Sequence, residues 1–283
     1  MIHSLQQTHA IPGHDGTDLY FRHIPAPNER CRVVVSHGLG EHSGRYTHVT
    51  DLLHSLGASV WIHDHRGHGR SQGKRGHVDH FDDYVSDLEI MLATAGRRSA
   101  KGTPLLLLGH SMGGLVALSF ARRYPGHVDG IIVSSPLLGV LRPLPPIIKA
   151  FVQTMAVIWP AMPLNNRVDA TFVSHDAAEV DAYRCDSLVH DRISARWAVS
   201  CVAEIAATGS APEALQEPVL MQIAGADGLV SAPAALDYYK ALEVADKTLC
   251  YYPDLYHELY NEKRPQRDKV LNDLKQWVAD RFL

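Results

Sequence analysis

The chain reads Leu105-Leu106-Leu107-Leu108-Gly109-His110-Ser111-Met112-Gly113-Gly114, an apolar run that leads into a serine flanked by glycines. The apolar run predicts a buried strand, and a helix-like stretch from Leu115 to Tyr124 follows the glycines. In the pattern G-x-S-x-G the glycines permit a turn too tight for larger side chains, and such a turn exposes the serine hydroxyl. We therefore predict that Ser111 is a nucleophile at a strand-to-helix turn.

A serine hydroxyl is a weak nucleophile, so it needs a histidine to accept its proton and an acid to orient that histidine. Asp227 comes just beyond the apolar run Val219–Ile223, after Ala224-Gly225-Ala226, in the position of a loop at the end of a strand. His257 lies between the last predicted strand and the last predicted helix. We predict the triad Ser111, Asp227 and His257, and we expect the rival acid Asp254 to shape the turn before the histidine.

The tetrahedral intermediate of such a reaction needs two backbone N–H groups directed at its oxyanion. Met112 supplies one candidate amide, at the start of the helix that follows the serine. The other candidate is Leu39, which lies between two glycines in His37-Gly38-Leu39-Gly40 after a predicted strand. We predict that the amides of Leu39 and Met112 form the oxyanion hole.

The segment from His63 to Ser71 contains three histidines and resembles a metal site at first sight. Zinc requires ligands that are fixed on regular elements and supported by further contacts. The glycines here indicate a loop, and no distant Cys/His partner is evident in the sequence. We expect no metal site, and the triad chemistry requires no cofactor.

Short apolar runs alternate with longer segments of helical periodicity, which is typical of parallel strands joined by helices. Strand-like runs such as Val33-Val34-Val35 do not alternate with polar residues, as expected for strands covered on both faces. We predict an α/β fold with a mostly parallel central sheet, flanking helices and an inserted, mainly helical cap. The strands are expected at Leu19–Ile24, Arg32–Ser36, Ser59–His63, Leu105–Leu108, Gly130–Ser134, Val219–Ile223 and Thr248–Tyr252. Helices are expected on the apolar stripes between Phe81 and Leu92 and between Val270 and Val278, the latter with Pro265 at its first position.

The alternation breaks at residues 136–218, which are too long for a simple crossover between strands. We expect this segment to be a cap, and residues 1–135 and 219–283 to form the core. Its apolar run from Ile147 to Trp159 follows Pro143-Leu144-Pro145-Pro146 and reaches about 20 Å as a helix, too short to span a bilayer. It is a buried cap helix, the wall of an acyl pocket, or a segment that enters a lipid interface.

The 283 residues include 46% hydrophobic and 20% charged residues, enough for one large domain with an insert. A formal net charge of −4 gives no electrostatic reason to expect a nucleic-acid partner. The four cysteines have no C-x-x-C spacing, so we expect buried free thiols. Residues Met1–Gln7 lack the basic start and apolar core of a signal peptide, which favours a cytoplasmic protein.

These motifs resemble the α/β-hydrolase superfamily, whose triad follows the same order along the chain, and within it the branch of monoacylglycerol lipases and lysophospholipases. The segment His37–Tyr46, HGLGEHSGRY, is similar to the H-G-x-G-E-H-x-x-R-Y signature of that branch. Tyr256–Glu262 resembles its segment around the catalytic histidine, and Val180–Leu188 resembles its V-D-x-Y-x-x-D-P-L stretch. Ser187 replaces the family proline, and Tyr260 stands where some relatives have a second histidine.

The resemblance implies hydrolysis of an ester between a fatty acyl chain and a glycerol-type alcohol. It places Glu41, Arg45 and Tyr183 around the alcohol, although Glu41 and Arg45 can equally form an ion pair that pins the oxyanion loop. The expected partner is a small lipid ester, with transient contact of the cap with a micelle or the inner face of a membrane; the sequence leaves the oligomeric state open.

Two rival functions remain open. A lysophospholipase, or a general carboxylesterase or thioesterase, would use the same triad with a different pocket. A ligand-binding protein without activity usually lacks a triad member, and none is missing here. Epoxide hydrolases and dehalogenases use an aspartate at the position of Ser111, so they are excluded.

Overall fold

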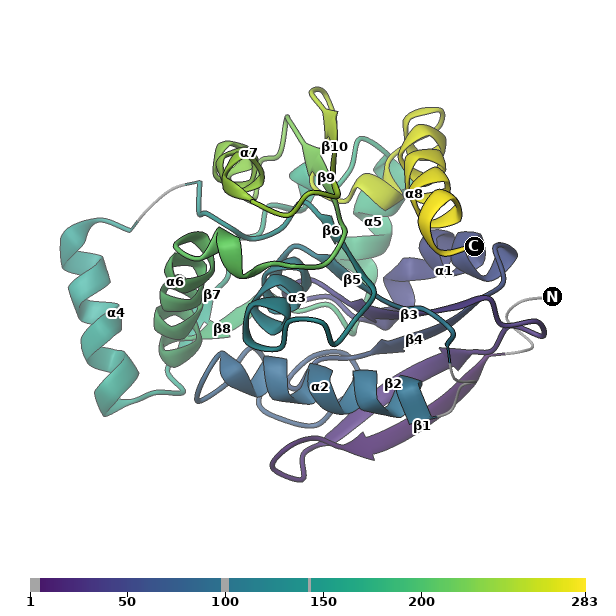
Figure 1. Ribbon diagram of the computed structural model, residues 1–283. Coiled ribbons are helices and arrows are strands. Elements are labelled where there is room, and N and C mark those ends of the chain that lie inside the picture. The colour runs from purple at the N-terminus through teal and green to yellow at the C-terminus, as the bar shows by residue number, and fades with distance from the viewer. Residues whose placement is uncertain (1–5, 98–101, 142–143) are drawn as a thin grey trace.

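An eight-stranded sheet forms the centre of the protein, with helices on both of its faces (Figure 1). The structure is a computed structural model that describes residues 6–97, 102–141 and 144–283; Pro143 and most of the N-terminal segment considered above lie outside these residues. The strand order is β1-β2-β4-β3-β5-β6-β9-β10. All pairings from β4 to β10 are parallel, whereas β1–β2 and β2–β4 are antiparallel. The predicted mostly parallel α/β sheet is therefore confirmed.

Seven of the eight strands of this sheet begin and end within two residues of the predicted runs. They are β2 (Asp18–Ile24), β3 (Cys31–Ser36), β4 (Ala58–His63), β5 (Leu105–His110), β6 (Gly130–Ser134), β9 (Val219–Ala224) and β10 (Lys247–Tyr252). The edge strand β1 (Gln7–Pro12) was not predicted, because its mostly exposed residues form no apolar run.

Two separate hydrophobic cores lie on the two faces of the sheet. On β3, Val33 and Val35 pack into one core and Val34 into the other, because successive side chains of a strand point to opposite faces. One face is covered by α1 (Thr47–Ser55) and α8 (Gln266–Phe282). The other face is covered by α2 (Asp82–Arg97), α3 (Met112–Arg123) and α7 (Ala232–Ala241). Pro265 is the N-cap of α8, one residue before the predicted position.

The segment between β6 and β9 is built mainly from helices. It contains α4 (Pro146–Ile158), β7 (Pro163–Asn165), the 3-10 helix η3 (Ala170–Phe172), α5 (Ala177–Cys185), β8 (Arg192–Ser194), α6 (Ala195–Gly209) and the 3-10 helix η4 (Pro212–Ala214). Strands β7 and β8 pair as a separate two-stranded sheet. Neither was predicted, since each is only three residues long.

Helix α4 lies at the edge of the molecule, beyond α6 (Figure 1). Its Val152 and Ala156 pack in a small cluster with Met162 and Ala195, and these contacts hold the helix to α6. Most of its other apolar side chains face solvent, including Ile147 at 85%, Val157 at 74% and Ile158 at 72% exposure. The interpretation of this run as a buried helix is therefore wrong.

The described helices include none that is both long enough and apolar enough to cross a membrane. The four cysteines are free. Cys31 and Cys201 are buried, as predicted, but Cys250 is only partly buried and Cys185, the last residue of α5, is exposed.

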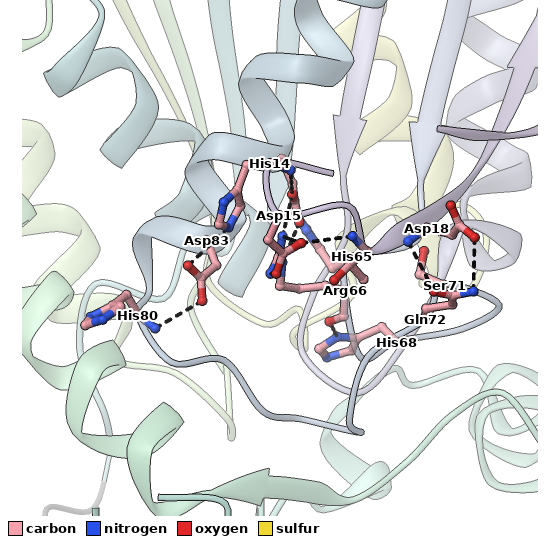
Figure 2. A network of polar contacts seen from close by, with 12 residues as sticks. His14, Asp15, Asp18, His65, Arg66, His68, Ser71, Gln72, His80 and Asp83 are labelled. Atoms are coloured by element: carbon pink, nitrogen blue, oxygen red, sulfur yellow. Dashed lines mark hydrogen bonds and ion pairs between the residues drawn. The ribbon is translucent and has the colours of Figure 1, made fainter. Parts of the chain in front are cut away.

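The loop after β4 is held in place by Arg66. Its guanidinium binds both oxygens of the fully buried Asp87 on α2, at 2.6 and 2.7 Å. It also binds Asp15 at 2.8 Å (Figure 2). Nearby, His14 pairs with Asp83 at the start of α2. The two carboxylates offset the cost of burying the Arg66 charge, and this cluster joins the turn between β1 and β2 to α2.

Candidate active site

Ser111 occupies a strained turn between β5 and α3. Its φ of 52° and ψ of −118° lie in a region that residues other than glycine rarely adopt. A Cβ atom on Gly109 would collide with the carbonyl oxygen of Gly113, so the turn closes only with glycine there. The Ser111 N–H donates to the carbonyl of Ser134 at 3.0 Å, and the N–H of Leu137 donates to the Ser111 carbonyl at 3.0 Å. These contacts hold the strained backbone in the form predicted for a nucleophile.

Asp227 and His257 meet although they are 30 residues apart. Asp227 follows β9, and His257 lies between β10 and the 3-10 helix η5 (Leu259–Asn261). His257 Nδ1 donates to Asp227 Oδ2 at 2.6 Å. The other oxygen, Asp227 Oδ1, accepts from the backbone N–H groups of Leu229 and Val230 at 2.8 and 2.9 Å. The carboxylate is thus fixed by its own loop and in turn fixes the imidazole, which leaves Nε2 as the nitrogen available to accept a proton.

The surroundings of His257 favour its protonated form. Burial alone lowers the pKa of a histidine, but the charge and hydrogen bond of Asp227 outweigh it, and Glu258 and Glu41 add to the effect. The pKa of His257 is therefore raised above its ordinary value of 6.5. The same contacts with Asp227 stabilise the imidazolium that forms when His257 accepts a proton.

The residue before Ser111 packs directly against His257. The ring centroids of His110 and His257 are 4.7 Å apart, and His110 Nδ1 donates to the carbonyl of Ser134 at 3.1 Å. Burial and the neighbouring His257 lower the pKa of His110 well below its usual range, so His110 stays neutral. The contact brings the serine turn and the histidine loop together. This contact of His110 was not predicted, because nothing in the local sequence shows which distant ring it meets.

The predicted oxyanion loop lies against the serine. A Cβ atom on Gly38 would be 3.3 Å from the Cβ of Ser111, and Leu39 follows Gly38 directly. Met112 is the first residue of α3. The loop is closed by Glu41, whose Oε1 accepts from the Gly38 N–H at 2.5 Å and from the Tyr46 hydroxyl at 2.6 Å. Gly38, the neighbour of Leu39, and Met112 thus both adjoin Ser111.

The three residues expected around the alcohol form one buried group. Arg45 Nε lies 3.6 Å from Glu41 Oε2, and the Arg45 guanidinium lies 4.9 Å from the centre of the Tyr183 ring. Arg45 Nη2 also binds Glu258 Oε2 at 2.5 Å. Burial, with the nearby charge of Glu258, raises the pKa of Glu41 to about 7 despite the opposing Arg45. Glu258 was not predicted, although it directly follows His257 in the sequence.

Two cavities border this group. One of about 10 Å³, enough for about one water, is lined by Glu41, Arg45, Tyr46, His110, Glu258, Tyr260 and Asn261. The other, of about 480 Å³, lies between the segment that joins β6 to β9 and the loop after β4, and is lined in part by Arg75, Tyr183, Arg184, Asp186 and Arg192. Arg45 lines the smaller cavity and Tyr183 lines the larger one, so the contact between these two side chains lies where the two cavities approach each other.

The histidine-rich loop forms a packed cluster of rings. His65 lies 4.5 Å from His37 and 4.6 Å from His63, measured between ring centroids. The His65 N–H donates to His37 Nε2 at 2.8 Å, and Ser36 Oγ lies 3.0 Å from His65 Nε2. Among the described residues, no three His, Cys, Asp or Glu side chains are arranged to hold a metal ion. The cluster supports the loop that leads to Leu39.

The mostly parallel sheet, the helices on both faces and the serine turn between β5 and α3 are those of an α/β-hydrolase. Residues 27–264 match the family described as "Serine aminopeptidase, S33". The chain therefore belongs to this family of α/β-hydrolases, and within it to the branch of the monoacylglycerol lipases.

Relatives of that branch match over nearly the whole chain. The monoacylglycerol lipase of Mycolicibacterium smegmatis is 32% identical, with 99% of each chain covered. The human monoglyceride lipase is 31% identical over 94% of this chain and 88% of its own length. The crystal structure of the Paleococcus ferrophilus monoacylglycerol lipase has a TM-score of 0.85 and 30% identity, and covers 93% of this chain and 99% of that one.

Proposed function

We propose that the protein hydrolyses monoacylglycerols to a fatty acid and glycerol through a triad of Ser111, Asp227 and His257. The observation that carries this proposal is the 2.6 Å hydrogen bond between His257 and Asp227, in a loop that packs on the strained serine turn. Its substrate class follows from the full-length similarity to monoacylglycerol lipases.

In the first step, His257 Nε2 accepts the proton of the Ser111 hydroxyl while Oγ attacks the ester carbonyl carbon. The amides of Leu39 and Met112 donate to the resulting oxyanion. The bond between the carbonyl carbon and the glycerol oxygen then breaks, and His257 gives its proton to that oxygen. Glycerol leaves, and the acyl group stays on Ser111 as an ester.

In the second step, a water molecule takes the place of the glycerol. His257 accepts a proton from the water, the hydroxide attacks the acyl carbon, and the bond to Ser111 Oγ breaks with return of the proton to Oγ. The products are the fatty acid and free enzyme. All of the chemistry is carried by side chains and backbone amides.

Residues 136–218 are the cap in this proposal, and residues 1–135 and 219–283 are the catalytic core. The acyl chain lies beneath the cap, and Glu41, Arg45 and Tyr183 border the alcohol. Since Glu41 Oε1 is already occupied by Gly38 and Tyr46, its main contribution is to shape the oxyanion loop. The exposed apolar side of α4 supports transient contact with a micelle or the inner face of a membrane.

A lysophospholipase activity is the second candidate. It is favoured by Arg75, Arg184 and Arg192, which line the 480 Å³ cavity and suit a phosphate group, although Asp186 and Asp191 line it as well.

The test is a substrate panel of monoacylglycerols of several chain lengths, lysophospholipids and short p-nitrophenyl esters. We expect the highest kcat/KM on monoacylglycerols, and labelling by a fluorophosphonate that disappears in Ser111→Ala. Highest activity on acetyl esters would refute the lipase assignment, and highest activity on lysophospholipids would favour the second candidate. A native protein that is not labelled would refute the serine mechanism.

A further inference from the structure

A short stretch of the cap, Phe172–His175, lies alongside the loop that carries His257. The His257 N–H donates to the Phe172 carbonyl at 3.2 Å, and the Glu258 N–H donates to the Val173 carbonyl at 2.9 Å. Ser174 Oγ donates to the Asn261 carbonyl at 2.8 Å. The cap therefore holds the backbone of the histidine loop itself, at the residue proposed as the base.

The side chain of Glu262 joins the two segments. It is fully buried, and among the described residues it forms no ion pair with a lysine or arginine. Its Oε1 accepts from Tyr256 N–H and from His175 Nδ1, each at 2.8 Å. Its Oε2 accepts from the backbone N–H of His175 at 3.1 Å and of Lys263 at 3.3 Å. One carboxylate thus binds the cap on one side and the histidine loop on the other.

The three consecutive N–H groups of Tyr256, His257 and Glu258 are all held in this way, the first by Glu262 and the other two by the cap. The rings of His175 and Tyr256 also stack, with centroids 3.6 Å apart. The backbone of Tyr256–Glu258 can therefore move little unless the cap moves with it.

The same stretch of cap reaches the acid. A Cβ atom on Gly228, the residue after Asp227, would collide with the ring of Phe172. Phe172 therefore packs on the Asp227 loop with its ring and accepts from His257 with its carbonyl. Both members of the 2.6 Å hydrogen bond between His257 and Asp227 are braced by one cap residue.

We propose that Glu262 is a positioning residue: its carboxylate fastens Phe172–His175 to the histidine loop, and the cap thereby sets the place of His257 between Asp227 and Ser111. This inference rests on the proposed function, because it assumes that His257 is the base. A displacement of about 1 Å of a catalytic group typically costs about 10²-fold in rate. The cap is then part of the catalytic apparatus as well as a cover for the substrate.

The test compares Glu262→Gln with wild type, with rates expressed per site labelled by a fluorophosphonate. In the variant, an amide NH₂ replaces one carboxylate oxygen of Glu262. Each of these oxygens accepts two hydrogen bonds, and an NH₂ group cannot accept them. The link between the cap and the histidine loop therefore loses two hydrogen bonds. We expect kcat on monoacylglycerol to fall by about 10²-fold with KM changed less than about twofold.

A second readout is the pH midpoint at which kcat/KM falls on the acid side. The charged or titratable groups that face His257 are Asp227, Glu258, Glu41 and His110, with Arg45 behind Glu258. Loosening of the loop weakens the contact with Asp227, so the midpoint should move to lower pH. A purely structural role lowers the yield of folded protein and leaves the midpoint per labelled site unchanged.

The matched control is Glu204→Gln. Glu204 is also a buried cap carboxylate, but it binds Ser119, Arg122 and Arg123 on α3, away from the histidine loop. We expect a lower Tm with wild-type kcat and midpoint per labelled site. If Glu262→Gln does not fold, His175→Ala removes only the exposed partner, and we expect a fall in kcat of about 5- to 10-fold.

Wild-type kcat and midpoint in the variant that folds would overturn the positioning role while leaving the hydrolase intact. A wild-type protein without fluorophosphonate labelling or esterase activity would instead overturn the proposed function itself.

Discussion

The backbone N–H of Gly38 donates to the carboxylate of Glu41 three residues later, at 2.5 Å between N and Oε1. The hydroxyl of Tyr46 donates to the same oxygen at 2.6 Å. One buried carboxylate thereby closes the loop that carries Leu39. The shape of this loop therefore depends on the hydrogen bonds of Glu41 as well as on the flanking glycines, where a Cβ atom would collide with Glu41 at Gly38 and with the His190 carbonyl at Gly40.

Glu41→Ala should lower kcat by about 5- to 150-fold, because a buried N–H and a buried hydroxyl lose their acceptor at a cost of about 1–3 kcal/mol. Glu41→Gln keeps a carbonyl oxygen for both donors and should retain at least about a fifth of the activity. Steady-state kinetics on a soluble p-nitrophenyl ester would measure both. Equal losses in the two variants would show that the charge of Glu41 matters rather than its acceptor role.

The activity should depend on the protonation of His257. Since the base must be neutral and its pKa is raised above 6.5, kcat/KM should be full at high pH and fall as pH drops through a midpoint above 6.5. Asp227→Asn removes the main interaction that raises this pKa, so the midpoint should move down. By comparison with other serine triads, kcat should fall by about 10⁴-fold.

Asp254→Asn is the control for that prediction, because Asp254 is the other acid near His257 in the sequence. It is exposed, and it should leave both the midpoint and kcat close to those of wild type. A large loss in Asp254→Asn together with near-normal activity in Asp227→Asn would reverse the assignment of the acid.

The histidine cluster should make the fold sensitive to acid. Burial lowers the pKa of His63 to about 4, and neither of its ring nitrogens has a hydrogen-bond partner among the described residues. Its pKa in the unfolded chain is near 6.5, so between about 6.5 and 4 the unfolded chain binds the extra proton. This contribution to stability is full above pH 6.5 and is lost as pH falls toward 4.

His63→Phe keeps an aromatic ring and removes the titration. The free energy of unfolding of wild type should fall more steeply with decreasing pH, by as much as about 1.4 kcal/mol per pH unit, than that of the variant. Urea unfolding at pH 7, 6 and 5 would measure the slopes. Identical slopes would place the acid sensitivity elsewhere in the cluster, such as at His37 or His65, whose pKa values burial also lowers.

The exposed apolar side of α4 should govern contact with lipid. Replacing Ile147, Val157 and Ile158 together by serine should weaken binding to phospholipid vesicles by at least about 10²-fold, because burial of each such side chain contributes about 1.5–3 kcal/mol. Activity on a soluble ester and Tm should stay near wild type, since these side chains are exposed. Tyr251→Ser, at an exposed position on β10, is the control and should bind vesicles normally.

Vesicle co-sedimentation and hydrolysis of micellar monoacylglycerol would be measured in parallel. Unchanged binding of the triple variant would mean that α4 does not contact lipid. Lost activity on the soluble ester would mean instead that α4 walls the acyl pocket.

The sequence predicted the parts of this protein that their own composition or residue spacing marks. Strands such as β3 and β6 are apolar because both of their faces are covered, so their composition alone indicates them. The turn at Ser111 needs glycine at fixed spacing, which a single pattern reveals. The edge strand β1 has one partner and mostly exposed residues, so no apolar run marks it.

The contacts that assemble the candidate site could not be predicted in this way. His110 meets His257, and Glu262 meets His175, only after the sheet brings distant segments together. The chain order of strands suggested that Asp227 and His257 would meet, but nothing in the local sequence shows that a stretch near Phe172 supports them both. Such long-range packing depends on the whole fold.

Helix α4 is joined to its surroundings by a few small contacts around Val152 and Ala156, while the sheet beneath is stabilised by two cores of its own. Mutations on the outer surface of α4 therefore carry almost no folding penalty. That surface can therefore change in sequence while the two cores, and the turn that carries Ser111, keep their structure.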